Sequence, residues 1–175
     1  MRIFISGGCK NGKSSRAQEL AVQNAGAPLY YIATMKPGDE EDRVRIQRHI
    51  DARQGLGFVT IETPMNIETV LTACDPRGSF LLDSTTALLS NEMFAGGAFQ
   101  RDAAAKMQMG LSAVLRELKN IVVVSDFIYA DALFYDEWTE AYRKALAGID
   151  RLCADACDVV LEAVCGNFIQ YKGGV

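Results

Sequence analysis

The chain has 175 residues, of which 49% are hydrophobic and 23% are charged, and its formal net charge is −4. This composition is typical of one globular domain with a buried core, and it excludes an intrinsically disordered chain. The net negative charge gives no general attraction to nucleic acid or to an anionic membrane, so any affinity for phosphate must be local.

A glycine-rich loop follows the first predicted strand. Residues 3–5 are apolar and predict a short strand, and residues 14–23 predict a helix. The loop between them, Gly7-Gly8-Cys9-Lys10-Asn11-Gly12-Lys13-Ser14, fits the pattern G-x-x-x-x-G-K-[ST] at every fixed position. A glycine-rich turn can match so short a pattern by chance, but the order strand, loop, helix is the setting that phosphate binding requires. We therefore expect this phosphate loop to bind a nucleoside triphosphate.

Each fixed position of the phosphate loop has a physical role. Gly7 and Gly12 allow backbone angles that are closed to other residues. Successive backbone N–H groups and the start of the next helix then face the phosphates. Lys13 is expected to reach the β- and γ-phosphate oxygens, and Ser14 to offer its hydroxyl to a magnesium ion.

The remainder of the chain alternates between predicted strands and helices. This alternation predicts an α/β fold with a mostly parallel central sheet, helices on both faces and a single domain spanning residues 1–175, as in P-loop NTPases. Asp39 is the expected N-cap of the second helix. Strands are predicted over residues 29–33, 58–62, 80–83, 121–124, 158–164 and 168–171, and helices over residues 39–53, 67–73, 101–118 and 136–156.

Two carboxylates follow apolar strands and are candidates for a catalytic or magnesium-linked role. Asp83 ends the strand 80–83 and is the stronger candidate, and Asp126 follows the strand 121–124. An aspartate in this position is often only the cap of the next helix, so both interpretations stand.

His49 is the chain's only histidine, and it lies between two arginines on a predicted helix. Arg45, His49 and Arg53 are spaced at i, i+4 and i+8 and therefore share one face. Neighbouring cations keep a ring nitrogen unprotonated and able to act as a nucleophile, and they hold a triphosphate beside it. The alternative is a solvated helix face with a surface histidine.

These residues resemble a known family, the bifunctional adenosylcobinamide kinase/adenosylcobinamide-phosphate guanylyltransferases of cobalamin biosynthesis. The resemblance depends on five ordered pieces that cover much of the chain. They are ISGGCKNGKSSRAQE from Ile5, YYIATM from Tyr30, DEEDRVRIQRHIDAR from Asp39, FVTIETP from Phe58 and LLDSTTALLSN from Leu81.

The resemblance implies two reactions. A nucleoside triphosphate phosphorylates (adenosyl)cobinamide, and GMP from GTP then passes through a guanylylated His49 onto that phosphate. His49, Lys13 and Asp83 are then the expected catalytic residues, with magnesium held by Ser14 and Asp83. The expected nucleotide-binding residues are Gly7, Gly8, Cys9, Lys10, Asn11, Gly12, Lys13, Ser14, Ser15, Thr34, Arg45, Arg53, Glu62 and Asp83.

The C-terminal half departs from the family pattern. Residues 125–129 stand where the family has Asn-Glu-Val-Gly, and Asp150-Arg151 replaces Asn-Gln. Two other functions therefore remain open. One is a P-loop kinase or nucleotidyltransferase with one activity or another small substrate, and the other is a non-catalytic nucleotide-binding regulator.

The sequence also leads to expectations about the cellular compartment of the protein. The phosphate loop begins at residue 7, leaving no room for a signal peptide, and no apolar run approaches the roughly 18 residues of a membrane span. Five cysteines without a secreted context favour reduced thiols in a cytoplasm, and the spacing of Cys153, Cys157 and Cys165 fits structural cysteines better than a metal site.

Because a corrinoid is large, we expect a cleft shared between subunits, and the resemblance implies a homotrimer in which the segment 35–57 folds over the nucleotide.

Overall fold

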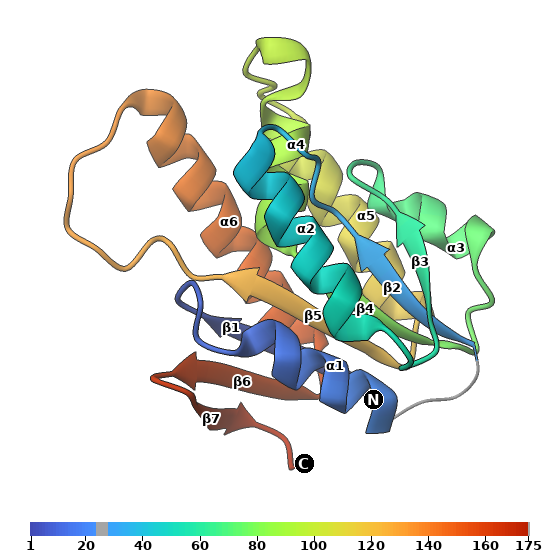
Figure 1. Cartoon of the computed structure of the whole chain (residues 1–175). Helices are drawn as coiled ribbons and strands as arrows, with labels where there is room; N and C mark the ends of the chain where they lie inside the picture. The colour runs from blue at the N-terminus through green and yellow to red at the C-terminus, as the bar shows by residue number, and fades with distance from the viewer. Residues whose placement is uncertain (24–27, 175) are drawn as a thin grey trace.

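A computed structural model describes residues 1–23 and 28–174 and shows one seven-stranded sheet (Figure 1). The strand order is β3-β2-β4-β5-β1-β6-β7, and all neighbours are parallel except β7, which pairs antiparallel to β6. The predicted mostly parallel sheet is therefore confirmed. The strands are β1 (Arg2–Gly7), β2 (Leu29–Ala33), β3 (Phe58–Glu62), β4 (Ser79–Asp83), β5 (Ile121–Asp126), β6 (Val159–Val164) and β7 (Asn167–Lys172).

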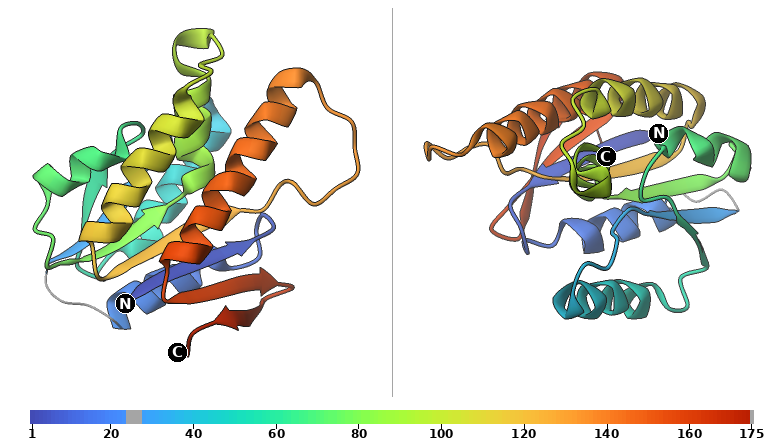
Figure 2. Two further views of the ribbon diagram at one scale, coloured as in Figure 1. Left: turned by 180° about the vertical axis from the view of Figure 1, so that it is seen from behind. Right: turned by 90° about the horizontal axis from the view of Figure 1, so that it is seen from above.

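Helices cover both faces of the sheet (Figure 2). On one face lie α1 (Lys13–Gln23) and, beyond it, α2 (Glu40–Arg53). The other face carries α3 (Val70–Ala73), α4 (Thr85–Met93), α5 (Ala103–Glu117) and α6 (Glu137–Ala156). Two apolar cores result, one between α1 and the sheet and a larger one beneath α4, α5 and α6. No helix of the described part of the chain is long and apolar enough to cross a membrane.

Helix α2 packs differently from the other long helices. Asp39 caps it as expected, accepting a 2.8 Å hydrogen bond from the backbone N–H of Asp42. Arg53 is the only one of its 14 residues that is buried, while Val44 and Ile50 are exposed. The helix is therefore attached through its last residue and not through an apolar face.

The structure differs from the predicted elements in two places. Helix α4 was not predicted, because Ser84, Thr85 and Thr86 have low helix propensity. The Ser84 hydroxyl caps this helix by accepting from the N–H of Ala87, and the apolar residues that follow are buried against the core. The helix predicted over residues 67–73 is a 3₁₀ turn, Ile67–Thr69, followed by the short α3.

Candidate active site

The carboxyl ends of the parallel strands meet at one edge of the sheet, where ligands bind in folds of this class. Gly7 at the end of β1 lies opposite Asp126 at the end of β5. Asp83 at the end of β4 lies opposite Val124. The phosphate loop and both candidate carboxylates are therefore close together, because β4, β5 and β1 are neighbours in the sheet.

Lys13, whose side chain is 5% exposed, is held by two oxygen atoms. Its Nζ atom lies 2.8 Å from Oδ1 of Asp126. It also donates a 2.5 Å hydrogen bond to the carbonyl of Gly8, which places the ammonium group at the phosphate loop. Of the two candidate carboxylates, Asp126 is therefore the one that contacts the lysine.

Strand β6 fixes the shape of the phosphate loop. A Cβ atom on Gly7 would lie 2.6 Å from the carbonyl oxygen of Ala163, so the close approach requires glycine. The Asn11 side-chain amide donates a 2.6 Å hydrogen bond to the same carbonyl. Gly12 has a φ of +90°, a conformation that other residues rarely adopt. Both fixed glycines thus have the conformational role that the sequence predicted.

The remaining residues of the loop differ in their access to solvent. Gly8, Cys9 and Lys10 form its exposed tip, with Lys10 at a φ of +57°. Ser14 is half-buried and Ser15 is exposed at the start of α1.

Asp83 faces a different partner from Asp126. One of its oxygen atoms, Oδ2, accepts a 3.0 Å hydrogen bond from the hydroxyl of Tyr31 and lies 3.7 Å from Nδ1 of His49. The second distance fits an ion pair when the imidazole is protonated, but it is too long for a hydrogen bond. Burial, followed by the nearby Asp83 charge, raises the pKa of Tyr31, so its hydroxyl remains a donor.

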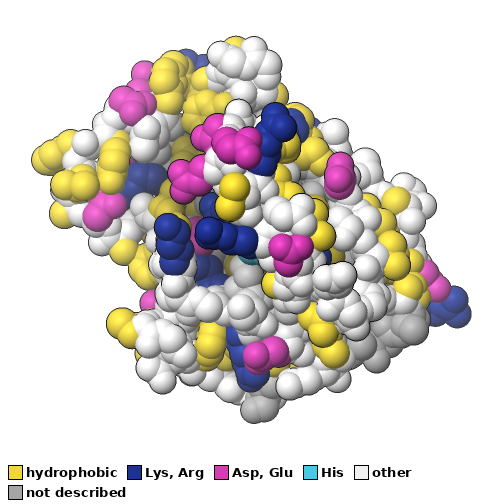
Figure 3. All heavy atoms as spheres, in the orientation of Figure 1, with side chains coloured by type: hydrophobic (Ala, Val, Ile, Leu, Met, Phe, Trp, Pro, Cys, Tyr) yellow, Lys and Arg dark blue, Asp and Glu magenta, His cyan; other side chains and the backbone are white. Residues whose placement is uncertain are grey.

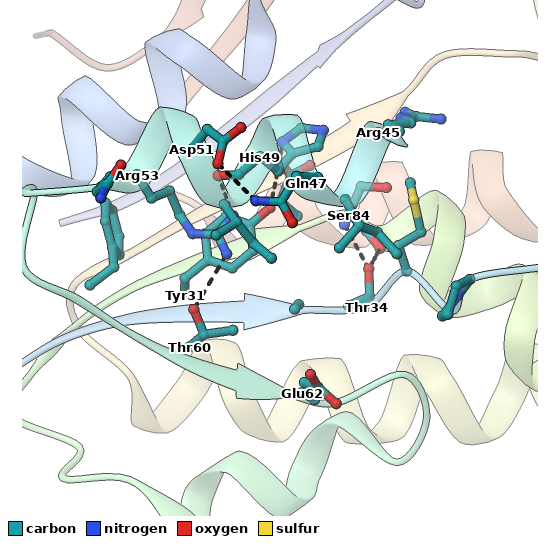
Figure 4. A pocket seen from close by; sticks show the side chains of 18 of the residues that line it. Tyr31, Thr34, Arg45, Gln47, His49, Asp51, Arg53, Thr60, Glu62 and Ser84 are labelled. Atoms are coloured by element: carbon teal, nitrogen blue, oxygen red, sulfur yellow. Dashed lines mark hydrogen bonds and ion pairs between the residues drawn. The ribbon is translucent and has the colours of Figure 1, made fainter. Parts of the chain in front are cut away.

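Arg53 anchors the helix that carries His49 (Figure 4). Its guanidinium carbon lies 3.6 Å from the centroid of the Tyr31 ring, a cation–π contact. The same group donates to the backbone carbonyl of His49 at 2.7 Å and to the Thr60 hydroxyl at 3.3 Å. Arg53 therefore has a structural role in addition to any contact with an anion.

The predicted face of α2 lines a pocket of about 1090 Å³ between this helix and strands β2 and β3. Arg45, His49 and Arg53 all line it, so their shared face is confirmed. Basic side chains gather beside the small visible part of the histidine on this side of the molecule (Figure 3). Of the described residues, none from the phosphate loop lines this pocket. His49 and Lys13 thus belong to separate parts of the site in this structure.

Thr34 and Glu62 also line the pocket, but in different ways. Thr34 is fully buried, and its hydroxyl donates to the backbone carbonyl of Ser84 at 2.9 Å and accepts from its N–H at 2.8 Å. This reciprocal pair fixes the ends of β2 and β4. Glu62 is exposed at the end of β3 and is one of the residues that line the pocket.

Tyr31 is the site residue that the sequence analysis did not single out. It contacts both Asp83 and Arg53 and thereby links the two halves of the pocket. The only sequence signal was its place in the matching piece YYIATM, because an aromatic residue in a strand is usually a core residue.

The two expected magnesium ligands lie at this edge, Ser14 at the start of α1 and Asp83 at the end of β4. Ser14 and Asp83 offer the oxygen ligands that magnesium prefers, and the ion usually takes its other ligands from phosphate and water. Among residues 1–23 and 28–174, no group of three or more His, Cys, Asp or Glu side chains is arranged to hold a metal. Cys153 and Cys157 are buried in the core, as expected for structural cysteines, while Cys165 is exposed.

Comparison with known proteins identifies the relatives of this chain. A family model described as cobinamide kinase / cobinamide phosphate guanyltransferase matches residues 3–171. The bifunctional adenosylcobalamin biosynthesis protein CobP of Pseudomonas aeruginosa is 30% identical over 99% of this chain and 98% of its own length. The protein CobU of Salmonella typhimurium is 28% identical over 98% of this chain and 100% of its own length.

Solved structures support the fold. A KaiC-like protein from Pyrococcus horikoshii superposes with a TM-score of 0.52 at 11% identity, covering 98% of this chain and 78% of its own. A second protein from that archaeon gives a TM-score of 0.51 at 14% identity, covering 98% and 86%. At such identities the likeness shows the P-loop NTPase fold alone.

Proposed function

The chain belongs to the cobinamide kinase / cobinamide phosphate guanyltransferase family, and on that premise we propose that it catalyses both reactions through the residues described above. It phosphorylates (adenosyl)cobinamide with ATP or GTP, then transfers GMP from GTP through a guanylylated His49 to give adenosylcobinamide-GDP in cobalamin biosynthesis. The observation that carries the proposal is the family match over residues 3–171, which spans the phosphate loop and a single histidine beside Asp83.

In the phosphorylation step the phosphate loop binds the triphosphate. Backbone N–H groups of residues 7–15 and the Lys13 ammonium receive the β- and γ-phosphates. Ser14 and Asp83 would hold magnesium, which neutralises the charge of the phosphates. The substrate alcohol replaces the nucleoside diphosphate on the γ-phosphorus.

In the guanylyl step His49 acts as the nucleophile. An unprotonated ring nitrogen attacks the α-phosphorus of GTP, a P–N bond forms, and the bond to the β-phosphate oxygen breaks to release pyrophosphate. An oxygen of the corrinoid phosphate then attacks the same phosphorus, and the P–N bond breaks. Asp83, near Nδ1, stabilises the positive charge of the substituted imidazole, and Arg45 and Arg53 with Thr34 and Glu62 line the nucleotide site.

Helix α2 must approach the phosphate loop for both steps to use one nucleotide site. Support comes from its packing, since only Arg53 of this helix is buried and the apolar residues Val44 and Ile50 are exposed. We propose that the segment 35–57 folds over the bound nucleotide and carries His49 toward it.

A trimer with a cleft shared between subunits fits the size of the substrate. The pocket of about 1090 Å³ is at the upper end of typical small-molecule sites of roughly 300–1,000 Å³, and a corrinoid plus a nucleotide exceeds it. Sedimentation that shows a fully active monomer at assay concentration contradicts this assembly.

A cytoplasmic location is the remaining part of the proposal. All five cysteines are free, and reduced thiols are typical of that compartment. Fractionation of cells that express the tagged chain checks it.

Intact-protein mass after incubation with GTP and magnesium tests the guanylylated histidine. Wild type is expected to gain the mass of GMP in an acid-labile form, and His49→Ala is expected to gain none. Arg48→Ala, on an exposed part of the same helix, is the matched control and should be labelled like wild type. If bound GTP leaves no adduct on wild type, the guanylyl step is wrong and a kinase or a nucleotide-binding regulator remains.

A further inference from the structure

The two carboxylates at the ends of β4 and β5 serve different partners. Asp83 contacts Tyr31 and faces His49, whereas Asp126 forms an ion pair with Lys13. Asp83 is therefore the carboxylate beside the histidine, and Asp126 is the carboxylate beside the lysine of the phosphate loop. From the sequence alone, Asp126 is only the second candidate, after Asp83, for a catalytic or magnesium-linked role.

We propose that Asp126 holds Lys13 in the nucleotide-free protein and then, when the phosphates take over the ammonium group, accepts the proton of the alcohol that attacks the γ-phosphate. The inference deepens the proposed kinase activity and rests on it. It names a catalytic residue for the phosphorylation half of the reaction only.

The backbone around Asp126 is fixed from both sides. Its own N–H donates a 2.8 Å hydrogen bond to the hydroxyl of Thr86 in α4. The next residue, Phe127, donates its N–H to the carbonyl of Gly7 at 3.0 Å. The backbone of Asp126 is therefore held beside the phosphate loop by neighbours that do not depend on Lys13, and it would stay there when the lysine moves.

Asp126 faces groups from the phosphate loop and from α6. Lys13 is the cation that faces it, and from α6 it is approached by Tyr142 and Asp150. Burial and then the Asp126 charge raise the pKa of Tyr142, so that side chain remains neutral. When Lys13 turns to the phosphates, the carboxylate oxygen that it contacted becomes free to accept a hydrogen bond from the substrate alcohol. At 15% exposure its side chain is still open to a substrate.

The step balances without a further reactant. The alcohol oxygen forms a bond to the γ-phosphorus while its O–H bond breaks and the proton passes to a carboxylate oxygen of Asp126. The bond between the γ-phosphorus and the bridging oxygen breaks, and the nucleoside diphosphate leaves with that electron pair. An aspartate in this role is an established solution for alcohol acceptors in phosphoryl transfer.

The test compares Asp126→Asn with wild type in three assays: nucleotide affinity, the GMP adduct on His49 and phosphorylation of cobinamide. Nucleotide should bind as tightly or roughly three- to tenfold more tightly, because the carboxylate that competes for Lys13 is gone. The adduct should form as in wild type. The phosphorylation kcat should fall roughly 10²- to 10⁴-fold without a rise in the KM for nucleotide. Asp126→Glu, which keeps a carboxylate, should recover part of this loss.

Asp102→Asn, at an exposed aspartate before α5, is the matched control and should match wild type in all three assays. Unchanged phosphorylation in Asp126→Asn overturns the proposal. Equal loss of all three properties also overturns it, because Asp126 is then only a support for the loop. If the wild-type protein binds nucleotide but does not phosphorylate cobinamide, the proposed kinase activity is wrong. The proton transfer to Asp126, which rests on that activity, is then wrong as well. Weaker nucleotide binding by Asp126→Asn separately refutes the competition for Lys13.

Discussion

The hydroxyl of Tyr129 donates a 2.8 Å hydrogen bond to Oδ2 of Asp150, which joins the segment after β5 to helix α6. Asp150 is 4% exposed, and in the described part of the chain its second oxygen has no hydrogen-bond partner. Burial raises the pKa of this carboxyl to about 6, despite the opposing effect of nearby hydroxyls. A buried, incompletely paired carboxylate therefore lies close enough to Asp126, at the end of β5, for the two charges to interact.

Asp150→Asn is expected to stabilise the protein at neutral pH. The folded pKa of about 6 exceeds the ordinary value of 3.8, so unfolding becomes easier as the pH rises from about 4 to 6 and stays easier above that range. The shift corresponds to about 3 kcal/mol. We expect Asp150→Asn to raise the free energy of unfolding by roughly 1–3 kcal/mol at pH 7.5 and by less at pH 4.5. Urea unfolding at both pH values measures the difference, and a larger gain at pH 4.5 contradicts the assignment.

Arg53→Ala is expected to loosen the attachment of α2. The substitution removes the contact with the Tyr31 ring and the hydrogen bonds to the His49 carbonyl and to Thr60, a loss of roughly 2–3 kcal/mol of unfolding free energy. Arg53→Lys should recover only part of it, since an ammonium cannot make the same planar contacts. Thermal unfolding measures both variants. Arg48→Ala on the same helix should change little, and an equal effect there would argue that helix charge alone matters.

Gly7→Ala is expected to distort the phosphate loop. Its new methyl group would lie 2.6 Å from the Ala163 carbonyl oxygen, forcing β1 and β6 apart at a cost of roughly 1–3 kcal/mol. Gly8→Ala is the control, because its Cβ would meet nothing closer than the Asn11 side chain at 3.8 Å. Denaturant midpoints compare the two variants, and equal midpoints contradict the close-packing explanation.

Arg143→Ala is expected to release the segment between β5 and α6. This buried guanidinium donates to the backbone carbonyl of Ile128, contacts Asp131 at 3.1 Å and lies 4.6 Å from the centroid of the Tyr135 ring. Without it, residues 127–136 should be cleaved at least about tenfold faster by a protease under native conditions. Arg116→Ala, at an exposed arginine near the end of α5, provides the control. Unchanged cleavage would mean that other contacts hold the segment.

The sequence by itself determined the fold class, the position of the phosphate loop and the helix face that carries His49. Hydrophobic runs are local features, and the alternation of strands and helices was enough to predict a parallel sheet with the phosphate loop after β1. The i, i+4 spacing placed Arg45 and His49 on one helix face because helix geometry is set within a few residues. Helix α4 was missed because burial in the core, a non-local effect, outweighs the weak propensity of its first turn.

Only the tertiary structure decided which groups meet. Asp83 and Asp126 look alike in sequence, each at the end of an apolar strand, but strand order brings Asp126 beside the loop strand β1 and leaves Asp83 next to β2 with Tyr31 and His49. The helix pattern predicts that Arg53 binds an anion. Its contacts with Tyr31 and Thr60 show that it also packs the helix against the sheet. Strand order and side-chain contacts depend on residues far apart in the chain, which local patterns do not encode.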